Sequence, residues 1–133
     1  MNPKIWGPHA WIFLHSIAYG YPENPTKNEQ VNAKKFFESL GYMLPCKTCS
    51  TLYIKDIKKI DSIDNAVKNK NNLIKWVNQM HNKVNENLNK KQYSDAEYDN
   101  YYQNMYENKT TNFNYILLLL IIFILTISYL ILS

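Results

Sequence analysis

Apolar residues recur along this chain at the spacing of an α-helix, and this periodicity constrains the fold more than any other feature. Between residues 73 and 88 they fall every three or four positions. Those residues are Leu73, Ile74, Val77, Met80, Val84 and Leu88. Only three of the 133 residues are glycine, and no Asn-Gly or Asp-Gly pair marks a β-hairpin. The pattern therefore predicts an all-α body.

Prolines and capping residues predict where the helices begin. Pro8 suits the first turn of a helix, and Thr26 with Glu29 three residues later is typical of a capping box. Pro45 interrupts the chain just before another helix. The predicted helices cover residues 8–20, 26–43, a segment beginning at about 46, 73–88 and 94–106, with a polar stretch at 55–70.

The segment Tyr115–Leu132 contains no charged residue, glycine or proline. Its 18 residues would span about 27 Å as a helix, close to the thickness of the hydrocarbon core of a bilayer. The hydroxyls of Thr126 and Ser128 can bond to carbonyls one turn earlier. The sequence thus predicts a folded domain at 1–106, a linker at 107–114 and a transmembrane anchor at 115–132.

The predicted anchor also suggests a location for the domain. The first residues lack the apolar core and cleavage site of a secretory signal. An apolar span this close to the last residue, Ser133, is expected to insert after translation. We therefore expect a single-pass protein in a host or virion membrane with its domain facing the cytosol. That topology leaves the glycosylation sequon at Asn108 unused.

The charge pattern argues against a nucleic-acid partner. Fifteen basic and eleven acidic residues give a net charge of +4. The lysines are spread from Lys4 to Lys109 among Asn, Asp and Glu, whereas nucleic-acid binders cluster their basic residues on one face.

The two cysteines, Cys46 and Cys49, form a CxxC motif. A structural disulfide between them would close a loop too short to constrain the unfolded chain. A zinc site needs four ligands, and the other donors, His9, His15 and His81, do not have the spacing of a zinc finger. The sequence therefore favours a redox pair and no metal, and the absence of a βαβ pattern excludes a thioredoxin-like domain.

Helix position suggests different roles for the two thiols. A helix N-terminus stabilises negative charge by about 0.3–1 kcal/mol, and by ~2 kcal/mol at best, which corresponds to roughly one unit in the pKa of Cys46. Cys49, one turn later, can then resolve a mixed disulfide formed on Cys46.

A second group of residues lies on the helix at 73–88. His81, Val84, Asn85 and Leu88 share one face, which mixes hydrogen-bonding and apolar groups. Periodicity alone leaves open whether this face is solvated or binds a ligand. A dithiol cannot pass two electrons to oxygen unaided at a useful rate, so an all-α CxxC protein suggests a cofactor.

Together these motifs resemble the Erv/ALR family of FAD-linked sulfhydryl oxidases, over about residues 6–102. The match runs through Trp6-Gly7-x-x-x-Trp11-x-x-Leu14-His15-x-x-Ala18, Tyr21-Pro22, Pro45-Cys46-x-x-Cys49 and His81-Asn82-x-Val84-Asn85-x-x-Leu88-x-Lys90. The short body and single cysteine pair are most similar to the forms encoded by large cytoplasmic DNA viruses.

The resemblance implies a four-helix bundle with a short fifth helix that holds FAD. Cys49 would lie against the flavin, Cys46 would exchange with substrate, and Lys90 would meet the pyrophosphate. The FAD contacts implied by the motifs are Gly7, Trp11, His15, His81, Asn82, Val84, Asn85, Leu88, Lys90 and, by a looser match, Tyr102. Pro8 stands where many relatives have arginine, which leaves one cofactor contact in doubt.

The implied activity is oxidation of a dithiol protein, expected to be viral, with O2 as acceptor and H2O2 as product. The family also implies a homodimer through the first two helices. We expect its apolar contacts to be Ile12, Phe13, Tyr19 and Phe37, because they lie off the flavin-facing stripe. Two alternatives stay open on the residues alone: a tail-anchored scaffold whose cysteines bind zinc or nothing, and a flavin-free thiol-disulfide carrier.

Overall fold

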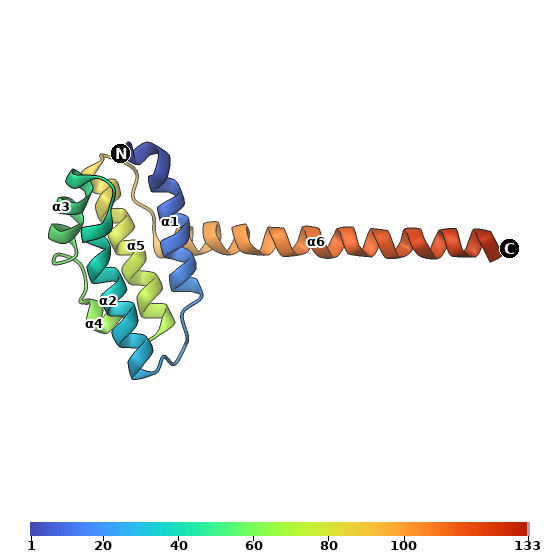
Figure 1. The fold of residues 1–133 in the computed structure, drawn as a ribbon, viewed down its shortest axis with the longest axis horizontal. Coiled ribbons are helices and arrows are strands. Elements are labelled where there is room, and N and C mark those ends of the chain that lie inside the picture. The colour runs from blue at the N-terminus through green and yellow to red at the C-terminus, as the bar shows by residue number, and fades with distance from the viewer. Residues whose placement is uncertain (133) are drawn as a thin grey trace. The chain divides into compact units, whose positions relative to one another are not determined.

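The computed structural model describes the backbone of residues 1–132 and the side chains of residues 1–107 and 115–130. Six helices account for all regular structure in this part of the chain (Figure 1). The chain divides into two compact units, Met1–Asp95 and Ala96–Ser133, called here the first and second units. The all-α prediction is therefore confirmed.

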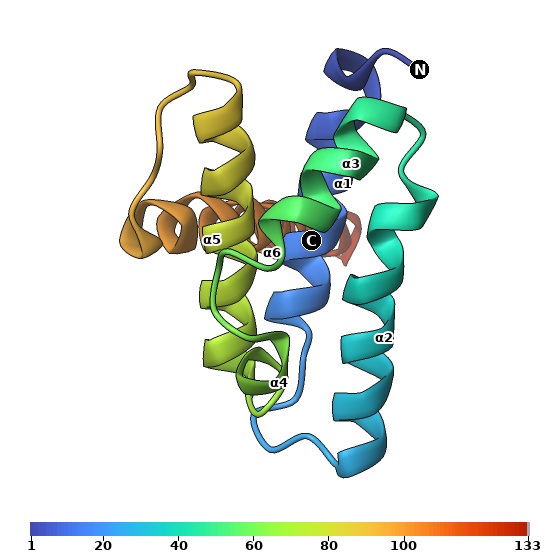
Figure 2. The ribbon, with the colours of Figure 1, turned by 90° about the vertical axis from the view of Figure 1, so that its left-hand side faces the viewer.

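The first unit is a bundle built around α5 (Lys70–Asn87). This helix packs against α1 (Pro3–Tyr19), α3 (Lys47–Asp56) and the single turn α4 (Ile63–Ala66). The helix α2 (Lys27–Met43) packs against α3, so the CxxC helix has a neighbour on each side (Figure 2).

Aromatic residues fill the core of the first unit. Phe37 and Trp76 are fully buried and meet edge to face, with ring centroids 5.1 Å apart. Two buried aromatic side chains donate hydrogen bonds to the backbone. The Nε1–H of Trp76 donates to the carbonyl of Asp61 (2.9 Å), and the hydroxyl of Tyr53 donates to the carbonyl of Phe37 (2.9 Å). Phe37 is 1% exposed, so its predicted role as a dimer contact is wrong: it belongs to the core.

Most helix boundaries follow the predicted signals, and α1 departs from them. It begins at Pro3 because the side chain of Asn2 accepts a hydrogen bond from the backbone of Lys4 (3.0 Å), and Pro8 lies inside the helix. In α2 the capping box of Thr26 and Glu29 is confirmed, with bonds of 2.7 and 3.3 Å between each side chain and the other residue's backbone.

The short helix α4 was not predicted, because one turn is too short to show an apolar period. It lies in the polar stretch at 55–70, where the side chain of Ser62 accepts a hydrogen bond from the backbone of Asp64 (3.3 Å). Ile63 and Ala66 are buried in the core, which ties this stretch to the bundle.

The second unit consists of a single long helix, α6 (Asp95–Leu132, 38 residues). The sequence predicted a short helix, a linker and an anchor there, but no glycine or proline interrupts residues 94–132, and the helix continues through 107–114. The side chains of 108–114, which include the sequon and Lys109, and the terminal Ser133 lie outside the described residues.

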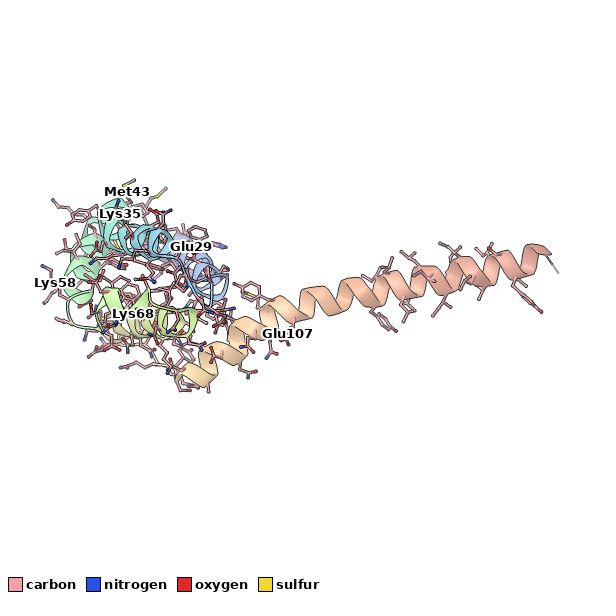
Figure 3. The ribbon with its side chains drawn as sticks, turned by 90° about the horizontal axis from the view of Figure 1, so that it is seen from below. Glu29, Lys35, Met43, Lys58, Lys68 and Glu107 are labelled. Carbon is pink, nitrogen blue, oxygen red and sulfur yellow. A yellow bond between two sulfur atoms is a disulfide. The ribbon has the colours of Figure 1, made fainter. Side chains whose placement is uncertain are left out.

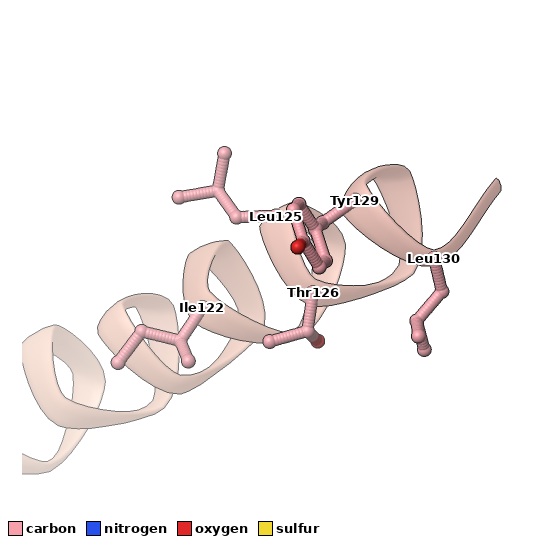
Figure 4. A pocket seen from close by; sticks show the side chains of 5 residues that line it. All are labelled: Ile122, Leu125, Thr126, Tyr129 and Leu130. Atoms are coloured by element: carbon pink, nitrogen blue, oxygen red, sulfur yellow. The ribbon is translucent and has the colours of Figure 1, made fainter. Parts of the chain in front are cut away.

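The described side chains at the far end of α6 are mostly large, apolar and exposed. The Thr126 hydroxyl donates to the carbonyl of Phe123 (2.8 Å) and the Ser128 hydroxyl to that of Ile124 (2.9 Å), which confirms the predicted back-bonding. A shallow hollow there is lined by Ile122, Leu125, Thr126, Tyr129 and Leu130 (Figure 4). Within the described residues, no helix combines the length and apolarity required to cross a membrane.

Candidate redox and cofactor site

Cys46 and Cys49 form a disulfide at the start of α3, with their Cα atoms 5.2 Å apart. Both residues are half-buried. Cys46 is the N-cap of the helix, and its Sγ accepts a hydrogen bond from the backbone N–H of Cys49 (3.2 Å). The predicted position of the pair at a helix N-terminus is confirmed, with the helix beginning one residue later than expected.

Gly41 allows the CxxC helix to pack closely against α2. A Cβ atom at this position would lie 2.8 Å from Cγ1 of Ile54 and 2.9 Å from Cδ1 of Tyr53. The hydroxyl of Ser50, directly after Cys49, donates to the Gly41 carbonyl. The sequence motifs did not predict a role for Gly41, although a glycine inside a helix costs about 1 kcal/mol relative to alanine and so indicates a packing need.

A buried carboxylate ties the other end of α3 to α5. Asp56 is 1% exposed, and its Oδ2 accepts a hydrogen bond from Nδ2 of Asn87 (2.6 Å). The ammonium of Lys59 lies 3.6 Å from the other oxygen. Asp56 and Asn87 were not predicted, because no local pattern shows that two distant polar residues will meet.

The residues predicted from α1 and α5 meet in an aromatic cluster. Nε2 of His15 and Nδ1 of His81 are 3.0 Å apart, within hydrogen-bonding distance. The rings of Trp11 and His81 stack with centroids 3.9 Å apart and planes within 5°. The structure therefore brings Trp11, His15 and His81 together, although 66 residues separate the two histidines.

Both histidines of this cluster are neutral at physiological pH. Burial, with a smaller contribution from His81, lowers the pKa of His15 to about 3. Burial, with a smaller contribution from the Lys90 ammonium, lowers the pKa of His81 to about 4. A neutral pair can share one proton between its facing nitrogens, and it presents an uncharged aromatic surface.

Other residues of the α5 motif lie at its last two turns. The amide of Asn82 holds the chain after the helix: its Nδ2 donates to the carbonyl of Tyr93 (2.6 Å), and its Oδ1 accepts from the backbone N–H of Tyr93 (2.9 Å). Asn85 is buried and Val84 half-buried, whereas Leu88 remains 56% exposed.

A left-handed residue ends α5 and turns the chain at Lys90. Asn89 has φ 52°, and its backbone N–H donates to the carbonyl of Glu86 (3.0 Å), while the N–H of Lys90 donates to that of Asn85 (2.8 Å). These two bonds make a Schellman motif, in which asparagine replaces the usual glycine. The turn holds Lys90 where its charge acts on His81.

Gly7 and Tyr102 are the remaining predicted contacts of the cofactor. A Cβ atom on Gly7 would meet nothing within 4 Å, so there is open space beside the backbone here. Tyr102 belongs to α6 in the second unit, where its ring lies 6.5 Å from that of Tyr98. Its contact with a cofactor stays a prediction.

The fold and site together define a redox protein built on a helical bundle. In its first unit a CxxC disulfide lies at the start of α3, and α1 and α5 carry a cluster of one tryptophan and two neutral histidines. This chain belongs to the Erv1 / Alr family, whose model matches residues 8–105. The resemblance inferred from the motifs is thereby confirmed.

Several relatives and solved structures are similar to this chain. A protein of Acanthamoeba polyphaga mimivirus named "Probable FAD-linked sulfhydryl oxidase" is 39% identical over 85 residues, which cover 64% of this chain and 59% of that protein. The FAD-linked sulfhydryl oxidase of African swine fever virus is 32% identical over 98 residues, covering 74% and 80%. The crystal structure of the FAD-binding domain of Erv1 from Saccharomyces cerevisiae superposes with a TM-score of 0.71 at 27% identity, covering 78% and 96%.

The chain matches only part of some of these proteins. The aligned region spans 59% of the mimivirus relative and 62% of a relative from invertebrate iridescent virus 3. The structural match to the yeast FAD-binding domain covers nearly all of that domain, so the shared part is the helical core.

Proposed function

We propose that this chain is an FAD-dependent thiol oxidase that forms disulfides in partner proteins and passes the electrons to O2, giving H2O2. The observation that carries the proposal is the Cys46–Cys49 disulfide at the N-cap of α3. Membership of the Erv1 / Alr family and relatives named as FAD-linked sulfhydryl oxidases support it.

The residues present fit FAD. The stacked, uncharged rings of Trp11 and His81 suit a flat aromatic group, and the half-exposed Leu88 offers it apolar surface. The open space at Gly7 lets a bound group approach the backbone. Lys90 offers a positive charge for the pyrophosphate. When bound, FAD supplies a two-electron acceptor that O2 can reoxidise.

The two cysteines have different roles in this proposal. A substrate thiolate attacks Sγ of Cys46, the Cys46–Cys49 bond breaks, and its electron pair leaves on Cys49. A second substrate thiolate then attacks the substrate sulfur of the mixed disulfide, which releases Cys46 as a thiolate. Cys49 does not resolve this mixed disulfide, because its attack on Cys46 would restore the starting disulfide. The hydrogen bond from the Cys49 N–H and the N-terminus of α3 stabilise that thiolate and make Cys46 a good leaving group.

A first experiment separates this function from its rivals. We expect the purified full-length chain to be yellow, with a flavin absorption spectrum, and to consume O2 when given dithiothreitol. A flavin-free carrier would exchange disulfides without consuming O2. A scaffold would be colourless and would not oxidise dithiothreitol.

We further propose a homodimer through the exposed face of α1. Ile12 and Phe13 are exposed there, and the Phe13 ring lies 6.4 Å from that of Phe36 on α2, so one apolar surface extends from α1 to α2. Tyr19 is half-buried at the end of the same helix. A small bundle gains stability when such a surface is covered by a second copy.

The far end of α6 is proposed as a membrane anchor with the first unit in the cytosol. The uncharged sequence of residues 115–132 and the exposed apolar side chains at 115–130 support the anchor, whereas the cytosolic side is a proposal that protease protection tests. Protease added to sealed membranes should digest the first unit and leave the anchor. A protected first unit, or a glycan on Asn108, would contradict the topology.

A further inference from the structure

The most exposed large apolar side chains of the first unit lie in two short segments that meet at Pro45, the residue before Cys46. They are Met1, Ile5, Tyr42 and Met43, with exposed fractions of 88, 71, 75 and 78%. The next apolar side chain of this unit, Phe13, is 57% exposed. The backbone nitrogen of Met1 donates to the carbonyl of Pro45 (3.1 Å), which brings the start of α1 beside the residue that precedes Cys46.

These side chains extend from the edge of the bundle, as Figure 3 shows for Met43. Methionine adapts its shape to a partner, and tyrosine is among the residues that contribute most to binding energy at interfaces. Core packing does not require either side chain here, because both are at least three-quarters exposed. We call Ile5, Tyr42 and Met43 the apolar rim.

The charged residues next to the apolar rim along the chain are mostly lysines, together with the exposed Glu38 one turn before Tyr42 on α2. Residues 1–22 and 39–55 contain no aspartate or glutamate, and their lysines are Lys4, Lys47 and Lys55. Lys47 lies between the two cysteines and is exposed. A partner that approaches Cys46 therefore meets apolar and positively charged surface together.

We propose that the apolar rim and Lys4 form the docking surface for the protein that Cys46 oxidises, and that this partner presents its dithiol beside apolar and acidic residues. The inference rests on the proposed thiol oxidase function, because the exchange step requires a partner sulfur to reach Sγ of Cys46. In that step the partner loses two electrons and two protons, and the Cys46–Cys49 disulfide becomes a dithiol.

The test compares the full-length, FAD-loaded chain on two synthetic dithiol peptides and on dithiothreitol. The peptides share the same cysteine spacing, but one has Leu and Asp beside its cysteines and the other Ser and Lys. We expect a lower KM for the Leu/Asp peptide, and we expect Lys4→Glu to remove the preference for acidic flanks. Equal KM values for the two peptides in the wild-type chain would overturn the proposal.

Two variants test whether the apolar rim causes the lower KM for the Leu/Asp peptide. The double variant Tyr42→Ser/Met43→Ser should raise the KM for the Leu/Asp peptide by about tenfold, which corresponds to about 1.4 kcal/mol, with dithiothreitol oxidation unchanged. Val31→Ser, at an exposed position near the other end of α2, is the matched control. It should change neither the KM for the Leu/Asp peptide nor the oxidation of dithiothreitol.

The remaining outcomes separate this proposal from the proposed function. A wild-type chain that oxidises neither dithiothreitol nor peptide refutes the thiol oxidase and the docking surface with it. Oxidation of dithiothreitol with an unchanged peptide KM in the double variant refutes the docking surface alone. A double variant that sediments as a monomer while the wild type is a dimer shows that the apolar rim joins two copies instead.

Discussion

At the scale of single residues, His15 and His81 make the first unit sensitive to acid. An unfolded histidine binds a proton near pH 6.5, whereas the folded pKa values are about 3 and about 4. Below about pH 6.5 the unfolded chain therefore holds more protons, and the free energy of unfolding falls as the pH falls. The free energy of unfolding can fall by at most about 1.4 kcal/mol per pH unit for each histidine. The decrease is smaller for His81, which is only half-buried.

We expect urea unfolding between about pH 7 and pH 5 to show this slope, and His15→Asn to reduce it. His9→Asn is the matched control for the substitution itself, because the exposed His9 lies on the same helix outside the buried pair. The same slope in wild type and His15→Asn would show that the buried pair is not its source.

Asn89 is a second residue with a specific backbone role. Its φ of 52° is strained for most side chains and suits glycine or asparagine. Asn89→Val should lower the free energy of unfolding by about 1–2 kcal/mol, whereas Asn89→Gly should preserve or raise it. Chemical denaturation measures both. Equal stabilities for the two variants would mean that the Schellman motif contributes nothing.

At the scale of elements, Gly41 sets the distance between α2 and the CxxC helix. Alanine there would gain about 1 kcal/mol of helix propensity but would press on Tyr53 and Ile54, at a cost of about 1–3 kcal/mol. Tyr53 is buried and hydrogen-bonded, so it cannot move aside easily. We expect Gly41→Ala to lower the melting temperature, while Ser39→Ala on the exposed face of α2 does not. A higher melting temperature for Gly41→Ala would contradict this packing.

The hydrogen bond between Asp56 and Asn87 joins α3 to the last turn of α5. Asn87→Ala removes the amide that donates to the buried carboxylate and should cost about 1–3 kcal/mol of unfolding free energy. The exchanged pair Asp56→Asn/Asn87→Asp should recover part of that loss, because it restores an amide–carboxylate contact. A double variant less stable than both single variants would show that these side chains do not act as a pair.

The elements differ in how far the sequence could predict them. The capping box and the apolar period of residues 73–88 are local signals, and both are confirmed. The CxxC pair and the contact between His15 and His81 were accessible through the family motifs. The roles of Gly41, Asp56 and Phe37 depend on which helix faces which, and no local pattern contains that information.

At the scale of the whole molecule, the proposed dimer depends on exposed apolar residues of α1. Phe13→Asp places a charge on this surface and should give a monomer in sedimentation at micromolar concentration, where we expect the wild type to be a dimer. His9→Asp, also exposed on α1, is the control for added charge. A wild-type chain that retains FAD and sediments only as a monomer would refute the dimer.

The length of the helix α6 was not predicted from the sequence patterns. The polar composition of the Asn-rich residues 107–114 predicted a linker. However, polar residues without glycine or proline can continue a helix, as they do in α6. Polarity alone therefore does not end a helix. The first compact unit ends at Asp95, where α6 begins, and the domain bounds expected from the sequence stay a prediction.

In the proposed function, the Cys46–Cys49 pair carries electrons from dithiols to O2 through bound FAD. The most direct measurement is O2 consumption with dithiothreitol by the wild type and Cys49→Ser, each loaded with FAD, with Thr48→Ala as an exposed control between the cysteines. Cys49→Ser should keep its flavin spectrum and lose O2 consumption, whereas Thr48→Ala should keep both. O2 consumption by Cys49→Ser at the wild-type rate would contradict the account.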